Sequence, residues 1–198
     1  MRDSSKSPNT DFLVFLDRDG VINRKLPGDR FVCDWSEFEF LPGTQEAIRT
    51  LNQSSVKVIL VTNQRGVSLG LYTEVDLQRL HAKMTSALNS CGARFDAIYY
   101  CPHSKNNCVC RKPGVGLFEQ AFRDFPRARS SASVIVGDSL SDMEAAQTLG
   151  CRKVLIQDRN GVVEQKARQA GIEIEFFSDG LLSAVRDFIL PTFAAMIS

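Results

Sequence analysis

Residues 12–20 read FLVFLDRDG, five apolar residues followed by two carboxylates that are one residue apart. An apolar run of this length between polar residues is typical of a strand buried on both faces of a parallel sheet. Asp17 and Asp19 would then leave the core together at the carboxyl end of that strand, where open α/β sheets bind ligands. Two adjacent like charges favour a divalent metal, an acid/base pair or both. An Asp-rich turn closed by Gly20 explains this motif alone equally well.

Apolar runs alternate with helical stretches along the rest of the chain. We expect strands at residues 12–16, 57–61, 97–100, 133–136, 153–156 and 173–176. We expect helices at residues 44–53, 73–90, 116–125, 140–149, 162–170 and 179–189. This alternation predicts an α/β fold of the doubly wound, Rossmann-like class, in which helices cover both faces of a mainly parallel sheet. Residues 21–41 predict an irregular flap after the carboxylates, and no segment is long enough for a large cap domain.

Length, composition and charge narrow the class of protein. A chain of 198 residues with 43% apolar residues predicts one globular domain, which we place at residues 11–190, after a disordered leader at 1–10 and before a tail at 191–198. The formal net charge is +1 and the basic residues are spread along the chain, so we expect no nucleic-acid partner. We find no secretory or membrane-spanning segment, and therefore expect a cytoplasmic protein, monomeric and without a membrane partner.

Three further predicted strands are followed by side chains that suit a phosphate or a metal. After the second strand come Thr62 and Asn63, whose hydroxyl and amide can donate to phosphoryl oxygens. The loop after the third strand carries the adjacent cations Arg111 and Lys112, which can neutralise phosphate charge. Asp138 follows the fourth strand and offers another oxygen ligand for Mg²⁺. Each motif alone is also explained as a turn, a solvated loop or a helix cap, but their joint occurrence favours a phosphate site.

A group of Cys and His residues lies in the loop that leads to these two cations. It has the spacing C-x-H-x4-C-x-C and consists of Cys101, His103, Cys108 and Cys110. Three thiolates and one imidazole within ten residues match a tetrahedral Zn²⁺ site, which has no open position and is therefore structural. Reduced cysteines without a metal are the alternative. We expect zinc, and we expect it to fix the neighbouring cations so that they face the phosphate.

In this order and context, the motifs resemble the haloacid dehalogenase superfamily of aspartate-nucleophile phosphatases. The resemblance covers residues 12–145. It implies that Asp17 attacks phosphorus and forms an aspartyl-phosphate, while Asp19 protonates the leaving group and then activates water. It also implies that Mg²⁺ is held by the Asp17 carboxylate, the Asp19 backbone carbonyl and Asp138.

The same resemblance assigns the substrate contacts. Thr62 and Asn63 would bind phosphoryl oxygens, and Lys112 would counter the charge on the nucleophile and the phosphate. Arg111 would contact a phosphate of the substrate. These roles agree with phosphoryl transfer in general, which depends on positioned charge more than on covalent chemistry.

Within the superfamily, the segments at residues 15–23, 61–67 and 110–113, together with the Cys/His loop, look like the heptose 1,7-bisphosphate 7-phosphatases. That resemblance implies a small phosphorylated sugar as substrate, dephosphorylated at C7 during nucleotide-heptose synthesis for lipopolysaccharide or a related glycan. The short Cys/His loop and Ser139, where relatives commonly carry Lys or Arg, depart from that family. Histidinol-phosphate phosphatase is the alternative enzyme. The alternative of another class is a non-catalytic, zinc-containing module that binds phosphate or a protein partner.

Overall fold

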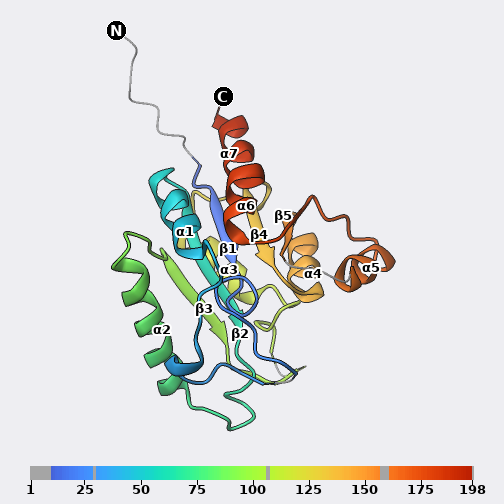
Figure 1. The fold of residues 1–198 in the computed structure, drawn as a ribbon. Coiled ribbons are helices and arrows are strands. Elements are labelled where there is room, and N and C mark those ends of the chain that lie inside the picture. Colours follow the sequence, from blue (N-terminus) through green and yellow to red (C-terminus); the bar gives the residue numbers. More distant parts are fainter. Residues whose placement is uncertain (1–9, 29, 106–107, 157–160, 198) are drawn as a thin grey trace.

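Six parallel strands form the centre of the molecule, in the order β3-β2-β1-β4-β5-β6 (Figure 1). The computed structural model describes residues 10–28, 30–105, 108–156 and 161–197. The strands are β1 (Leu13–Leu16), β2 (Lys57–Asn63), β3 (Ala97–Cys101), β4 (Ser133–Gly137), β5 (Arg152–Ile156) and β6 (Phe176–Ser178). The strand order changes direction between β1 and β4, and this is the place where open α/β sheets form a ligand crevice at their carboxyl edge.

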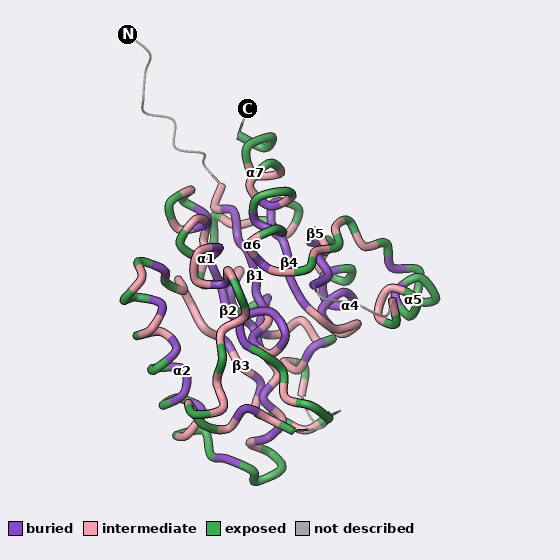
Figure 2. Tube along the Cα trace, viewed as in Figure 1, coloured by how far each residue is buried: buried purple, intermediate pink, exposed green. Residues whose placement is uncertain are grey.

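Helices cover both faces of the sheet, which confirms the doubly wound α/β fold. They are α1 (Thr44–Gln53), α2 (Glu74–Asn89), α3 (Gly116–Asp124), α4 (Leu140–Leu149), α5 (Val162–Gln169), α6 (Leu181–Ala184) and α7 (Leu190–Ile197). The side chains of β1 point alternately to the two faces of the sheet. Val14 and Leu16 pack with α1 and α6 on one face, and Leu13 and Phe15 pack with α3 and α4 on the other. Figure 2 shows the resulting buried centre, with the long runs of buried residues on the central strands.

The C-terminal segment departs from the sequence-based prediction. The chain stays helical beyond residue 189, through a π-helical turn at Val185–Ile189 and then α7. Pro191 lies in the first turn of α7, next to the π-helical turn, where the helix tolerates its missing N–H. Phe193 packs its ring 5.0 Å from that of Phe12, so this helix is attached to the start of β1. Strand β6 also begins three residues later than we expected.

The histidine of α2 is buried. His81 lies on α2, is 6% exposed and packs edge-on against Tyr100 of β3. The sequence could not show this, because burial here depends on which face of α2 meets the sheet. The start of that helix does match its sequence signal, since Thr73 and Asp76 form a reciprocal capping box.

Residues 1–9 of the expected leader lie outside the described residues. Within the described ranges of the chain, no helix combines the length and the apolar character needed to cross a bilayer.

Candidate active site

A cavity of about 230 Å³ opens at the carboxyl edge of the sheet, between the ends of β1 and β4. Side chains from β2, the flap after β1, the end of the Cys/His loop and the start of α4 share its wall. Every predicted catalytic, phosphate-binding and magnesium-binding residue lies on it: Asp17, Asp19, Thr62, Asn63, Arg111, Lys112 and Asp138. Segments that are more than a hundred residues apart in the sequence therefore meet at one place.

Lys112 connects two of the acidic groups at the floor of this cavity. Its ammonium nitrogen Nζ lies 2.8 Å from Oδ1 of Asp17 and 2.6 Å from Oδ1 of Asp142, and it donates a hydrogen bond to the carbonyl of Val61. The side chains of Lys112 and Asp142 are 2% and 1% exposed. Asp142 lies in the first turn of α4, and the structure makes it a buried partner of Lys112.

The acidic groups outnumber the cations that neutralise them. Ligand oxygens of Asp17, Asp138 and Asp142 lie within 4.8 Å of one another. Burial raises the pKa of Asp17 to about 7; Lys112 opposes that rise, and the charges of Asp142 and Asp138 add to it. Oδ1 of Asp138 is buried without a hydrogen-bond partner. Carboxylate oxygens with excess negative charge and an unpaired lone pair fit a hard divalent cation such as Mg²⁺.

Two features bring Asp138 to this position. Gly20 has a φ of +95°, and a Cβ at this residue would collide with the Asp138 carboxylate, so only glycine lets the loop after β1 approach so closely. From the flap, Lys25 places its Nζ 2.8 Å from Oδ2 of Asp138. Burial raises the pKa of Asp138, and the Lys25 charge opposes that effect.

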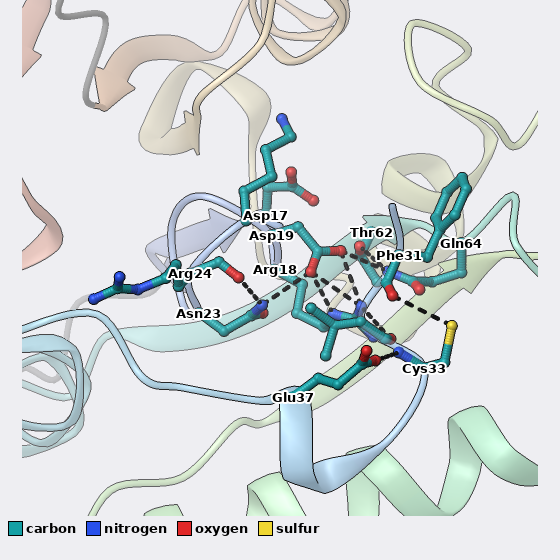
Figure 3. A network of polar contacts seen from close by, with 12 residues as sticks. Asp17, Arg18, Asp19, Asn23, Arg24, Phe31, Cys33, Glu37, Thr62 and Gln64 are labelled. Carbon is teal, nitrogen blue, oxygen red and sulfur yellow. Dashed lines mark hydrogen bonds and ion pairs between the residues drawn. The ribbon is translucent and has the colours of Figure 1, made fainter. Parts of the chain in front are cut away.

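The carboxylate of Asp19 points in a different direction from that of Asp17 and is surrounded by donors (Figure 3). Nη2 of Arg18 donates to both of its oxygens at 2.9 and 3.1 Å, Nδ2 of Asn23 donates at 3.0 Å and Nε2 of Gln64 donates at 3.1 Å. Burial alone would raise the pKa of Asp19, but the Arg18 charge and the hydrogen bonds from Asn23 and Gln64 lower it below its usual value. The carboxylate is therefore held as an anion in a fixed orientation.

The predicted phosphate-binding residues differ in how much of their bonding capacity is free. Oγ1 of Thr62 accepts a hydrogen bond from Gln64, which leaves its hydroxyl proton available. The amide of Asn63 donates to the backbone carbonyl of Lys112 and accepts from the backbone N–H of Lys112, which leaves one N–H available. Asn63 therefore holds the Lys112 backbone in place. Arg111 lies at the cavity wall and donates to the carbonyl of His103 at 3.5 Å.

The four side chains of the Cys/His group lie close together, just before Arg111 and Lys112 in the same loop. The Sγ atoms of Cys101, Cys108 and Cys110 are 3.1 to 3.5 Å apart, and Nδ1 of His103 lies 3.3 Å from Cys110 Sγ and 3.7 Å from Cys101 Sγ. A tetrahedral zinc site with Zn–S bonds of about 2.3 Å has S–S edges of about 3.8 Å. The four donors therefore fit a closed Zn²⁺ site.

Comparisons with known proteins agree with this geometry. The HAD-hydrolase-like family matches residues 109–184. A Mycobacterium tuberculosis protein named D-glycero-alpha-D-manno-heptose-1,7-bisphosphate 7-phosphatase is 42% identical over 137 residues, which are 69% of this chain and 72% of that protein. A Bordetella bronchiseptica protein named as the corresponding beta-heptose phosphatase is 41% identical over 150 residues, 75% of this chain and 82% of that protein. The chain belongs to this family of HAD-like phosphatases.

Solved structures of HAD-like phosphatases share the fold. The crystal structure of D,D-heptose 1,7-bisphosphate phosphatase from B. bronchiseptica, complexed with magnesium and phosphate, matches with a TM-score of 0.79 at 35% identity and covers 90% of this chain and 98% of that chain. The phosphatase of the same name from Burkholderia thailandensis matches with a TM-score of 0.64 at 30% identity, over 89% of this chain and 97% of that chain. Membership of this family makes the chain a phosphatase.

Several residues at the site of this HAD-like phosphatase escaped the sequence analysis. Lys25 gave no signal beyond its place in the flap. Gln64 stood in the motif after Thr62 and Asn63 without an assigned role. Only the spacing of four residues between Asp138 and Asp142, which places both near one end of α4, could have indicated that the two carboxylates are neighbours.

Proposed function

We propose that this chain is a magnesium-dependent phosphatase that removes the C7 phosphate of D-glycero-D-manno-heptose 1,7-bisphosphate. The contact between Lys112 and Asp17 carries this proposal. It places a carboxylate and a buried cation side by side on the wall of one cavity at the sheet edge. The names of the relatives support the substrate. The alternative of a non-catalytic module is disfavoured, since Asp17, Asp19 and Lys112 are all present and lie together.

In the proposed reaction, a carboxylate oxygen of Asp17 attacks phosphorus and the bond from phosphorus to the sugar oxygen breaks. Asp19, which takes up a proton when the anionic substrate binds, gives that proton to the departing alkoxide. Asp19 then takes a proton from water, whose oxygen attacks the aspartyl-phosphate and releases inorganic phosphate. The donors around Asp19 favour its ionised form, which suits its role as a base, and the negative charge of the entering substrate raises its pKa for its role as an acid.

Mg²⁺ would be held by the carboxylates of Asp17 and Asp138 and by the backbone carbonyl of Asp19, and would supply positive charge to the nucleophile and the phosphate. Lys112 supplies the fixed positive charge of the chain itself. Thr62 would donate its hydroxyl proton to a phosphoryl oxygen. For Asn63 we propose that the main role is to position Lys112, since its amide is bonded to the Lys112 backbone.

We propose a structural role for Zn²⁺ in the Cys/His group. Ligation by Cys101, His103, Cys108 and Cys110 would fix the end of the loop, and Arg111 follows the last ligand directly. Arg111 would then contact the phosphate of the sugar that does not react. The monomeric state and the cytoplasmic location belong to the same proposal.

The test compares both anomers of heptose 1,7-bisphosphate, histidinol phosphate, a 3′-phosphorylated oligonucleotide and p-nitrophenyl phosphate at equal concentration, with and without Mg²⁺. We expect the highest kcat/KM for one of the heptose anomers, no turnover without Mg²⁺, and no turnover by Asp17→Asn. A preference for histidinol phosphate would reassign the substrate. Absence of phosphate release from every compound would support the non-catalytic module, and full activity of Asp17→Asn would remove the nucleophile from the proposal.

A further inference from the structure

Gln64 links the carboxylate of Asp19 to a tyrosine outside the cavity wall. Its amide nitrogen Nε2 donates to Oδ2 of Asp19 at 3.1 Å and to Oγ1 of Thr62 at 2.9 Å. Its amide oxygen Oε1 accepts a hydrogen bond of 2.6 Å from the hydroxyl of Tyr72. Gln64 is 1% exposed and Tyr72 is 7% exposed, so water competes little for these bonds.

The bonding capacities of these groups fix the orientation of the amide. The nitrogen of the Gln64 amide faces two acceptor oxygens, Oδ2 of Asp19 and Oγ1 of Thr62. The amide oxygen must then face Tyr72, which has a proton to donate. Burial raises the pKa of Tyr72, which keeps that proton in place. The Tyr72 hydroxyl therefore selects the amide orientation in which Gln64 donates its hydrogen bond to Asp19.

The backbone around Gln64 is shaped to receive the tyrosine. A Cβ at Gly66 would collide with the ring of Tyr72, so glycine at this position lets the ring pack against the turn. The same turn is held at the sheet edge by a backbone bond from Gln64 to Cys101. Tyr72 thus packs against the turn, and it is not among the residues that line the cavity wall.

We infer that Tyr72 is a positioning residue for catalysis, acting through the amide of Gln64 to hold Asp19 in the orientation from which it protonates the leaving group. The inference rests on the proposed function and deepens it. Tyr72 itself touches neither substrate nor metal in this scheme. Its removal leaves the charge and identity of Asp19 unchanged, and frees the Gln64 amide to rotate.

The experiment uses the dependence on the leaving group. A sugar alkoxide is a poor leaving group and needs the proton of Asp19, whereas p-nitrophenolate departs without one. We measure kcat/KM, which includes the cleavage step, for Tyr72→Phe with p-nitrophenyl phosphate and with the alkyl phosphate that the wild type turns over fastest. We expect a loss of about 10-fold on the alkyl phosphate and a change of less than about 2-fold on p-nitrophenyl phosphate.

Tyr99→Phe is the matched control. The hydroxyl of Tyr99 also donates a hydrogen bond of 2.6 Å, but to Asp124, away from the cavity. We expect its loss to affect both substrates equally or not at all. Gln64→Leu, which removes the donor to Asp19 directly, should reproduce the selective loss on the alkyl phosphate and exceed it.

The outcomes separate this inference from the proposed function. Equal losses of Tyr72→Phe on both substrates, or no loss on either, would overturn the positioning role while the enzyme remains a phosphatase. A wild type that hydrolyses neither phosphate ester would instead overturn the proposed function. Circular dichroism of each variant at the assay temperature verifies that the compared proteins are folded.

Discussion

The ammonium group of Lys112 lies 2.6 Å from the carboxylate of Asp142, and both side chains are almost entirely removed from solvent. The same nitrogen also reaches Asp17, so one buried cation serves two buried anions. The negative charges raise the pKa of Lys112 despite the effect of burial, so it stays protonated. This arrangement couples the stability of the fold to Asp17, the proposed nucleophile, because loss of the Lys112 cation removes the ion-pair partner of both carboxylates.

Replacement of Lys112 by methionine should therefore damage folding and catalysis together. A buried carboxylate that loses its partner costs about 3 to 5 kcal/mol of unfolding free energy. We expect Lys112→Met to lose about this amount in urea denaturation and to lose phosphatase activity. The double variant Lys112→Met/Asp142→Leu should recover part of the stability and none of the activity. Activity in the double variant would contradict a catalytic role for the Lys112 charge.

Lys25 should compete with the catalytic cation. Its Nζ lies 2.8 Å from Asp138, which offers oxygens to the proposed magnesium site. Removal of a nearby positive charge makes the site more attractive to a divalent cation, so Lys25→Met should bind Mg²⁺ about 3- to 10-fold more tightly in calorimetric titration. Lys83→Met on α2 is the control and should bind like the wild type. Weaker binding by Lys25→Met would show that Lys25 helps to build the site.

Loss of one Cys/His ligand should release zinc and weaken the active site from a distance. We expect protein purified without chelator to hold about one zinc ion per chain by elemental analysis, and Cys110→Ser to hold much less. Because Arg111 and Lys112 follow Cys110 directly, kcat/KM should fall in the same variant. Cys91→Ser, outside the group, should keep both zinc and activity. A zinc-free wild type with full activity would contradict the proposed structural zinc.

The buried imidazole of His81 should make the protein sensitive to mild acid. Burial lowers the pKa of His81 from 6.5 to about 3, whereas in the unfolded chain it takes up a proton below about pH 6.5. As the pH falls below about 6.5, the unfolded state therefore binds more protons than the folded state. The free energy of unfolding then decreases. Between pH 7.5 and 5 the loss amounts to about 2 kcal/mol.

The measurement compares urea unfolding of the wild type and of His81→Leu across this range. Asp17 has a raised pKa and titrates in the same range with the opposite effect on stability, but it is present in both proteins. The difference between the two curves therefore isolates the histidine. Parallel curves would mean that His81 accepts its proton equally well in the folded and unfolded states.

The elements of the fold were largely predictable from the local sequence. The apolar run before Asp17 became β1, and the helix expected from residue 73 became α2, which Thr73 and Asp76 cap. The structure of the C-terminal end was not predictable in this way, because the π-helical turn before Pro191 and the packing of Phe193 depend on contacts with distant residues.

The candidate site also combines features that could be predicted from the sequence with features that could not. The positions of Asp17, Asp19 and Asp138 at the cavity were predictable because all three closely follow apolar runs, and parallel strands bring their carboxyl ends to one edge. The close approach of Cys101, His103, Cys108 and Cys110 was predictable from their spacing alone. The buried state of Asp142 was not, because the sequence of a helix start looks the same whether its acid faces water or Lys112.

By itself, the sequence determined the class of fold, the family and the kinds of groups at the site, since alternation of apolar runs and short motif spacing are local properties of the chain. Only the tertiary structure decided how those groups share their charges and hydrogen bonds. It directed Asn63 to the Lys112 backbone, placed Lys25 on Asp138, and connected Tyr72 to Asp19 through Gln64. The physical reason is that burial, charge compensation and donor geometry depend on which distant segments meet, and local sequence does not encode those distances.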